Sequence, residues 1–159
     1  YFSAYDNMYF TGDGALRDKN GHYRITGRVD DVIIVSGHNL GTAPIEDVIN
    51  EHPAVSESAI VGYPHDIKGS ALYGYVTLKN ANDSSETLKA EINQLISKQI
   101  GPIAKLTKIQ FTNGLPKTRS GKIMRRILRK IASKDTSNLG DISTLLNPEV
   151  VETIMKNSQ

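Results

Sequence analysis

Alternating and periodic apolar positions divide the chain into short predicted strands and helices. Residues 22–25, 32–35, 58–61, 71–78 and 108–112 have the apolar and β-branched composition of strands. Elsewhere apolar residues recur every three or four positions, as on one face of a helix. These repeats predict helices that begin near residues 42, 84, 122 and 148.

Capping residues and helix breakers locate the ends of two of these helices. Thr42 is a predicted N-cap, Pro44 fits the first turn, and Glu46 and Asp47 would lie near the positive end of the helix. Residues 83–86, Asp-Ser-Ser-Glu, have capping-box spacing ahead of the second helix. Gly101-Pro102 is predicted to end that helix.

The order of these elements predicts the fold class. From residue 32 the chain reads strand, helix, strand, strand, helix, strand, helix, which is typical of an α+β domain with a small mixed sheet packed with helices on one face. A short β segment, with a hairpin turn at residues 18–21, precedes it. Charged, glycine-flanked residues place a boundary near Asp30. The predicted units are 1–29, 30–134 and a C-terminal extension, 135–159.

Composition limits the class of protein. The chain has 159 residues, 38% apolar and 23% charged, which suits one compact soluble domain with appendages. It contains no cysteine, which excludes disulfides and thiolate chemistry. We find no apolar run long enough for a membrane span and no signal-peptide pattern, so we expect a cytoplasmic protein without a membrane partner. The start at Tyr1, without Met, leads us to expect a fragment of a longer protein.

Charge is distributed unevenly along the chain. Residues 1–100 carry 8 Lys/Arg and 13 Asp/Glu, whereas residues 101–159 carry 11 and 4. Seven of the fourteen residues 117–130 are basic. Such a segment suits an anionic, phosphate-bearing ligand. A free-standing basic module that binds anions or nucleic acid is therefore an alternative function, although no aromatic residues for base stacking are interleaved with these cations.

Residues 116–122, Pro-Lys-Thr-Arg-Ser-Gly-Lys, are the strongest candidate for chemistry. Pro116 disfavours helix, Ser120 and Gly121 favour a turn, and Ile123 begins a helical apolar repeat, so Lys122 should lie where a loop meets a helix. A P-loop is excluded, because six residues separate Gly114 from Gly121 where four are required.

Four motifs in order resemble the adenylate-forming superfamily. They are Tyr-Phe-Thr-Gly-Asp at 9–13, Ile-Thr-Gly-Arg-Val-Asp-Asp at 25–31, Val-Ser-Gly-His at 35–38 and the segment 116–130, continued by Ser-Asn-Leu-Gly-Asp at 137–141. Within that superfamily the chain is most similar to the AMP-forming acetyl-CoA synthetase family.

The resemblance implies a two-step ligase reaction. Acetate and ATP give acetyl-adenylate and pyrophosphate, and the thiol of CoA then gives acetyl-CoA and AMP. Residues 1–29 would be the tail of a large N-terminal AMP-binding domain and residues 30–134 the mobile C-terminal domain, which rotates between the steps. This fragment alone is expected to be inactive, because the acyl pocket lies in the N-terminal domain.

Four residues match nucleotide and hinge positions of the family. The resemblance implies that Asp13 accepts hydrogen bonds from the ribose hydroxyls of ATP or AMP and that Arg28 holds the same nucleotide. Asp30 matches the hinge, with a plain loop aspartate as the alternative. Lys122 matches the catalytic lysine, whose ammonium offsets negative charge during adenylation. A solvated cation is its alternative.

Other family positions concern CoA, phosphate and magnesium. Ser36 and Gly37 match the loop that lines the CoA tunnel. Asn39 and Ser97 stand where many relatives use arginine, on the ATP phosphates and the CoA 3′-phosphate respectively, so these two phosphate contacts stay open. The resemblance also implies a magnesium site at three positions, Asn50, His52 and Val55. A structural His at a helix end is the alternative for His52. The resemblance also makes Lys122 a candidate for acetylation by a lysine acetyltransferase, with a deacetylase to reverse it.

Overall fold

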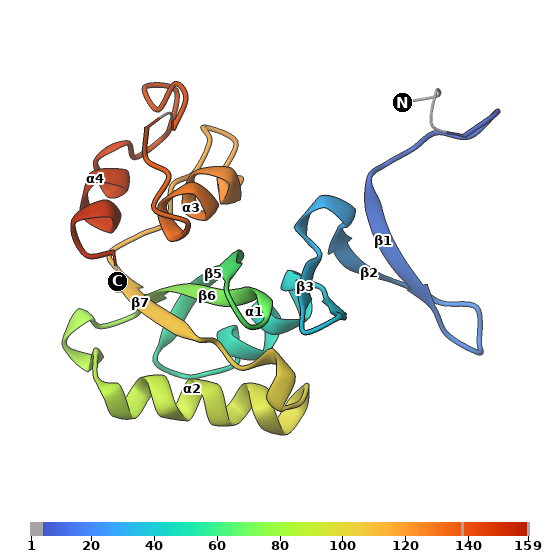
Figure 1. The fold of residues 1–159 in the computed structure, drawn as a ribbon, viewed down its shortest axis with the longest axis horizontal. Coiled ribbons are helices and arrows are strands. Elements are labelled where there is room, and N and C mark those ends of the chain that lie inside the picture. The colour runs from blue at the N-terminus through green and yellow to red at the C-terminus, as the bar shows by residue number, and fades with distance from the viewer. Residues whose placement is uncertain (1–4, 138, 159) are drawn as a thin grey trace.

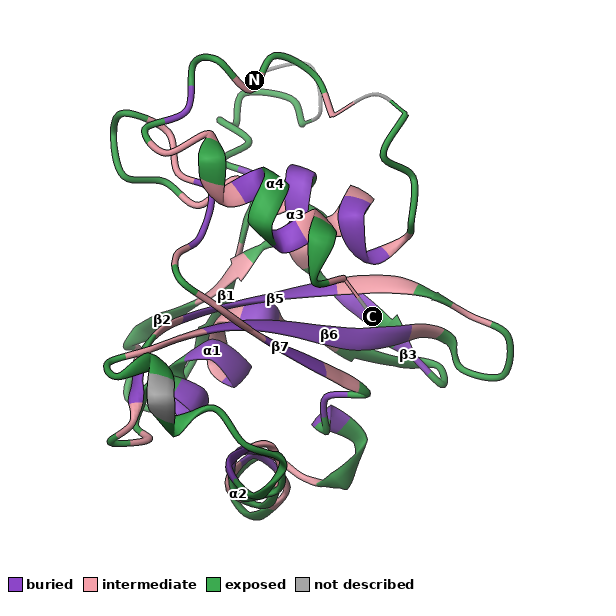
Figure 2. Cartoon of the chain, turned by 90° about the vertical axis from the view of Figure 1, so that its left-hand side faces the viewer, coloured by how far each residue is buried: buried purple, intermediate pink, exposed green. Residues whose placement is uncertain are grey.

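A two-stranded sheet is followed by a five-stranded mixed sheet lying between two layers of helices (Figures 1 and 2). The computed structural model describes residues 5–137 and 139–158. Residues 1–4 of the predicted first unit, and Asn138 and Gln159 of the predicted extension, lie outside the described residues. The strands are β1 Asp13–Arg17, β2 Tyr23–Arg28, β3 Ile33–Val35, β4 His38–Leu40, β5 Val55–His65, β6 Gly69–Leu78 and β7 Lys108–Thr112. The α-helices are α1 Thr42–Asn50, α2 Glu86–Gln99, α3 Arg125–Ala132 and α4 Glu149–Lys156.

The two-stranded sheet is the predicted N-terminal hairpin, which stands to one side of the main body in Figure 1. Strand β1 pairs antiparallel with β2, so that Asp13 is opposite Arg28. In the turn, Asp18 Oδ1 accepts hydrogen bonds from the backbone N–H groups of Asn20 and His22 at 2.8 and 2.9 Å. These bonds satisfy backbone donors of the hairpin turn, which was predicted from the Asp-Lys-Asn-Gly sequence.

Strand β6 is the centre of the main sheet. It pairs antiparallel with β5 along most of its length and parallel with β7, while β3 joins it at one end through Val35 and Gly69. The sheet is therefore mixed, as predicted. The three-residue strand β4, which pairs with β3, was not predicted, because it is too short to show alternation.

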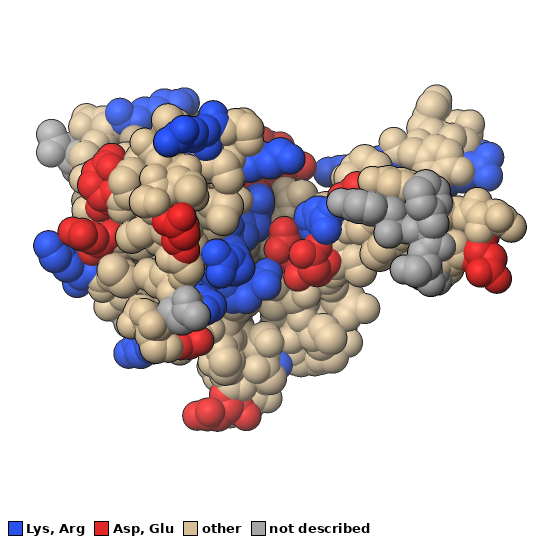
Figure 3. Space-filling model, turned by 90° about the horizontal axis from the view of Figure 1, so that it is seen from above, with Lys and Arg blue, Asp and Glu red and all other residues tan. Residues whose placement is uncertain are grey.

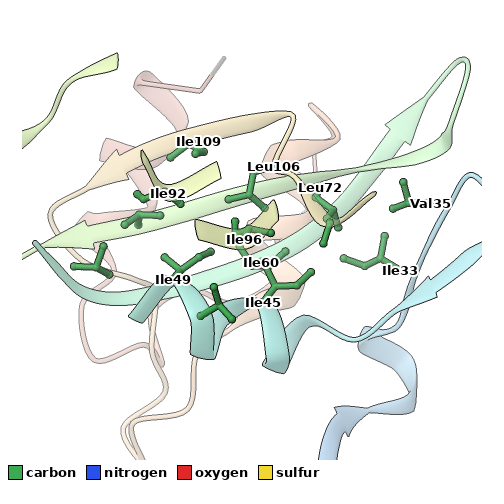
Figure 4. Packing of buried hydrophobic residues seen from close by; sticks show 14 of the residues in the cluster. Ile33, Val35, Ile45, Ile49, Ile60, Leu72, Ile92, Ile96, Leu106 and Ile109 are labelled. Atoms are coloured by element: carbon green, nitrogen blue, oxygen red, sulfur yellow. The ribbon is translucent and has the colours of Figure 1, made fainter. Parts of the chain in front are cut away.

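Helices cover both faces of this sheet, so the prediction of helices on one face is wrong. Helices α1 and α2 lie on one face, and α3 and α4 lie on the other (Figure 2). Leu72 and Val76 of β6 belong to the first apolar cluster, drawn in Figure 4, whereas Tyr73 and Tyr75 belong to the second. Residues 71–76 are all buried, because both faces of β6 are covered.

Two predicted caps are displaced by a residue or two. The N-cap of α1 is Gly41, not Thr42, and it makes no side-chain cap. The N-cap of α2 is Ser85, whose Oγ accepts a hydrogen bond from Leu88 N at 3.1 Å, so the capping box expected from Asp83 is not formed. Helix α2 ends before Gly101-Pro102, as predicted.

The segment predicted as a C-terminal extension contributes to the second cluster. Leu145, Val151 and Ile154 are buried there against α3 and the sheet. Gln110 of β7 accepts a hydrogen bond from the Tyr73 hydroxyl at 2.8 Å and donates one to the Ile154 carbonyl at 3.0 Å. These buried bonds join α4 to the sheet. No helix within the described ranges is long and apolar enough to cross a membrane.

Candidate functional site

The loop that carries Lys122 is closed by its own hydrogen bonds; we call residues 116–124 the Lys122 loop. Thr118 N donates to Lys122 O at 2.9 Å, and Lys122 N donates back to Thr118 Oγ1 at 3.1 Å. At the base, Met124 N donates to Pro116 O at 2.8 Å. Gly121, with φ of +82°, supplies the left-handed turn. The backbone of the loop is thus a small hairpin of fixed shape.

Lys122 lies in this hairpin and not at the start of the helix. Ile123, expected to open the helical repeat, instead forms a bridge with Lys117, and α3 begins at Arg125. The Lys122 side chain is exposed. Within residues 5–137 and 139–158, its ammonium makes no hydrogen bond or ion pair.

Two basic residues that flank Lys122 are each paired with a carboxylate. Lys117 Nζ lies 2.6 Å from Glu57 Oε2. Arg125 binds Glu46 through Nε at 3.3 Å and Nη2 at 2.5 Å. Glu46 is only 7% exposed, and burial raises the pKa of its carboxyl while the hydrogen bonds and charge of Arg125 oppose that rise. The sequence predicted that Glu46 lies near the positive N-terminal end of α1. This is wrong, because the first turn of α1 contains no acidic residue and the Glu46 carboxylate binds Arg125.

The nucleotide and hinge candidates lie together at the end of the N-terminal hairpin. Arg28 Nε donates to Asp30 Oδ1 at 3.0 Å, and its Nη1 lies 3.7 Å from Asp13 Oδ1. Asp30 lies in a one-turn 3-10 helix, Val29–Asp31, that follows β2. Gly12 has a φ of +75°, which favours glycine, and its backbone passes close to the Arg28 guanidinium, 2.9 Å from where a Cβ would lie. One arginine therefore links the nucleotide candidate to the hinge candidate.

A hollow of about 580 Å³ joins this group to the Lys122 loop. Its walls include Arg28, Asp30, Lys122 and Arg126. Figure 3 shows Lys and Arg gathered in the middle of this face, next to Asp and Glu, between the main body and the N-terminal hairpin. The hollow is open and rich in cations, so it can accept part of a phosphate-bearing ligand.

The candidates for CoA binding at Ser36 and Gly37 form the turn between β3 and β4. Both have positive φ, 48° and 81°, as in a type I′ hairpin turn. A Cβ at Gly37 would meet no atom within 4 Å, so the requirement for glycine here is the backbone conformation. Asn39 follows in β4, is exposed, and pairs with Ile34.

Ser97 lies on α2, away from the Lys122 loop. It lines a second hollow of about 560 Å³ together with Lys98 and Lys105. Thus the structure brings Arg28, Asp30 and Lys122 to one hollow, with Asp13 against Arg28, and does not bring Ser97 there.

The magnesium candidates lie between the end of α1 and the start of β5: Asn50 is the last residue of the helix, His52 lies in the turn, and Val55 is the first residue of the strand. Asn50 Oδ1 accepts a hydrogen bond from Ser58 Oγ at 2.9 Å, and the His52 carbonyl accepts one from Val55 N at 3.0 Å. His52 Nδ1 accepts from Ala54 N at 3.3 Å, and Nε2 lies 3.5 Å from Glu91 Oε2. Because Nδ1 is an acceptor, the neutral ring carries its proton on Nε2 and offers no free lone pair to a metal. The imidazole as placed does not fit a metal ligand.

Sequence reasoning missed the carboxylates that organise the site. Glu46, Glu57 and Asp31, which binds Arg129 of α3 at 3.0 Å, are each far in sequence from their basic partners. The available signal was modest: Glu46 stands next to Ile45 and three residues before Ile49, on the buried side of a helix. A carboxylate in that position needs a partner.

Comparison with known proteins identifies the family of the chain. Residues 44–122 match the model described as AMP-binding enzyme C-terminal domain, and the chain belongs to that family. Over all 159 residues it is 61% identical to the acetyl-coenzyme A synthetase of Syntrophobacter fumaroxidans and 58% identical to that of Escherichia coli K12. The chain spans 24% of the length of each of these relatives.

Solved structures of adenylate-forming enzymes share the fold. The anthranilate CoA ligase AuaEII in complex with anthranoyl-AMP matches 80% of this chain and 25% of its own, with a TM-score of 0.73 and 31% identity. ATP-bound MatB from Rhodopseudomonas palustris matches 77% of this chain and 24% of its own, with a TM-score of 0.68 and 29% identity.

Proposed function

We propose that this chain is the C-terminal part of an AMP-forming acetate–CoA ligase. The observation that carries the proposal is the hollow that Lys122 shares with Arg28 and Asp30, in a chain 58–61% identical to acetyl-CoA synthetases. The acetate substrate rests on that identity. The boundary near Asp30, between a tail of the N-terminal domain and a mobile C-terminal domain, is part of the same proposal.

In the first half-reaction a carboxylate oxygen of acetate attacks the α-phosphorus of ATP, and pyrophosphate leaves. Negative charge shifts over the α-phosphate oxygens and the acetate oxygen as this bond forms. The Lys122 ammonium offsets this charge electrostatically, without covalent chemistry. The Lys122 ammonium has no ion-pair partner among the described residues, whereas Lys117 and Arg125 are each paired with a carboxylate, so the Lys122 charge is available to a substrate.

Asp13 and Arg28 hold the nucleotide in this proposal. The Asp13 carboxylate accepts hydrogen bonds from the ribose hydroxyls, and the Arg28 guanidinium stays beside it as in the present 3.7 Å pair. Asn39, which has an amide in place of a cation, would add one hydrogen bond to an ATP phosphate.

In the second half-reaction the thiolate of CoA attacks the acetyl carbon, and AMP leaves. A rotation about Asp30 removes Lys122 and brings the turn of Ser36 and Gly37 to the pantetheine. Ser97, with Lys98 and Lys105 beside it, faces the CoA 3′-phosphate. Rotation about Asp30 thus changes the residues presented to the substrate between the two half-reactions.

Magnesium, when bound, would screen the phosphate charge of ATP. Because the His52 ring as placed offers no lone pair, we assign no step to a metal at Asn50, His52 and Val55. The further partners are the N-terminal domain of the same protein and a lysine acetyltransferase and deacetylase acting on Lys122. Acetylation would remove the charge described above. We place the enzyme in the cytoplasm.

Replacing Lys122 tests the proposal. In the complete protein, Lys122→Ala should lower acetate-dependent ATP–pyrophosphate exchange at least a hundredfold and leave acetyl-CoA formation from supplied acetyl-adenylate within about twofold. Arg119→Ala is the matched control, because it removes another exposed cation from the same loop. Equal loss of both half-reactions would contradict the assigned role.

The basic-module alternative makes a separate prediction. It requires salt-dependent binding of oligonucleotides by this chain. Within residues 5–137 and 139–158, carboxylates engage at least three of the cations of residues 117–130, namely Lys117, Arg125 and Arg129. We therefore expect no specific binding of a fluorescent DNA oligonucleotide in a salt titration, and no acetyl-CoA formation by the isolated 159-residue chain.

A further inference from the structure

Strand β5 lies at an edge of the main sheet, and the Lys122 loop is attached to that edge. The strand order is β4-β3-β6-β5, so one side of β5 has no strand partner among residues 5–137 and 139–158. Edge strands carry unpaired backbone groups that other parts of the protein must satisfy. Here the Ile60 N–H of β5 donates to Glu46 Oε1 at 2.8 Å. The carboxylate of an α1 residue thus takes the place of a neighbouring strand.

The same carboxylate reaches the opposite layer of helices. Glu46 binds the Arg125 guanidinium with both oxygens, at 3.3 and 2.5 Å, and Arg125 is the first residue of α3. Helix α1 packs in the first cluster and α3 in the second. Glu46 is therefore a bridge around the edge of β5, and it fixes the residue three positions after Lys122.

The other side of the loop is attached to the same edge. Glu57 is a residue of β5, and its Oε2 lies 2.6 Å from Lys117 Nζ. Both side chains are 28% exposed. Asn147 adds a third fixation, because its Oδ1 accepts from Lys117 N at 3.1 Å and its Nδ2 donates to the Leu115 carbonyl at 2.9 Å.

We propose that Glu46 and Glu57 are positioning residues for adenylation, which hold the two ends of the Lys122 loop against the edge of β5. This inference rests on the proposed role of Lys122. Because Thr118 and Lys122 close the hairpin themselves, fixing its two ends fixes the position of the Lys122 backbone from which the side chain extends. The two acids also engage Lys117 and Arg125, so that these two cations do not compete with Lys122 for the substrate.

Conservative amides are the direct test in the complete protein. Glu46→Gln keeps an oxygen for the Ile60 N–H but loses the charge that orients Arg125. We expect about a tenfold fall in kcat of ATP–pyrophosphate exchange with KM for ATP unchanged, since a small displacement of a catalytic group has effects of this size. Glu57→Gln, at a more exposed pair, should cost about threefold. Thioester formation from supplied acetyl-adenylate should stay within twofold for both.

A double-variant experiment separates positioning from general stability. If Glu46 acts through Lys122, Glu46→Gln should cause no further loss of exchange in a Lys122→Ala background. The control is Glu86→Gln, which removes the carboxylate of an exposed pair with Lys89 on α2 and should leave both half-reactions unchanged.

The outcomes also separate this inference from the function on which it rests. Full adenylation by Lys122→Ala would overturn the proposed function itself. With Lys122 confirmed as essential, three results would each overturn only the positioning role: unchanged exchange in both Gln variants, equal loss in the two half-reactions, or the same tenfold fall in the Lys122→Ala background.

Discussion

The Lys122 loop and the linker at residues 29–31 line the same hollow, yet they are held in different ways. The loop follows the fully buried Leu115, and its two ends are paired with Glu46 and Glu57. The 3-10 turn Val29–Asp31 has no buried residue and is flanked by extended backbone on both sides. The difference teaches that one wall of the hollow is fixed to the core at both ends, whereas the other has no buried residue and is joined to α3 through the ion pair of Asp31 with Arg129 at 3.0 Å.

Removing a core side chain beneath the loop should have the largest effect. Ile127 of α3 is fully buried in the second cluster, so Ile127→Ala should lower the free energy of unfolding by about 3 kcal/mol through lost burial and an unfilled cavity. Val29→Ala, on the linker, removes a side chain that is 51% exposed and should cost less than about 0.5 kcal/mol. Urea unfolding of the two variants measures this contrast, and equal losses would contradict it.

Restricting the linker should affect one half-reaction. Asp30→Pro fixes φ near −65°, so it should slow thioester formation about tenfold or more and adenylation much less, because in the proposed function only the second step follows the rotation. Asp30→Ala removes the same carboxylate without fixing φ and serves as the control. The readouts are acetyl-CoA formation from supplied acetyl-adenylate and pyrophosphate exchange, in the complete protein. Unchanged thioester formation in the Pro variant would argue against a pivot at this residue.

The smallest effect concerns pH and the same linker. A hydrogen bond from its own backbone N–H, followed by the bond from Arg28, holds the pKa of Asp30 below its ordinary value of 3.8. A lowered folded-state pKa contributes stability that is fully present above pH 3.8 and is lost as pH falls through the lower folded value. Asp30→Asn should therefore reduce the loss of stability in acid slightly, as measured by thermal unfolding between pH 5 and pH 2. An unaltered pH dependence would show that the two bonds of the Asp30 carboxylate contribute nothing to stability.

Local features were predictable from sequence, and long-range ones were not. Strand β7 was predicted with the correct bounds and α2 with the correct end, because Gly101-Pro102 and the apolar repeats act within a few residues. The start of α3 was misplaced, because Ile123 fits a helical repeat but pairs with Lys117 across the hairpin. Local periodicity does not report such a pairing.

The candidate site shows the same division. Lys122, Arg28 and Asp30 stand in local motifs, and the structure places all three on one hollow. The partners of the flanking cations could not be predicted, because Glu46 and Glu57 are brought to Lys117 and Arg125 only by the packing of helices on both faces of the sheet. The sequence-based prediction of helices on one face left no place for a carboxylate that connects two layers.

The contacts along β5 also bear on the solubility of the protein. An edge strand of eleven residues is long enough to recruit a strand from another molecule and start aggregation. Glu46 occupies the Ile60 N–H, Asn50 binds Ser58, and Glu57 holds a lysine over the strand. Substitutions that free the loop would therefore also uncover a template for intermolecular β-pairing, so that loss of activity and a tendency to aggregate should appear together.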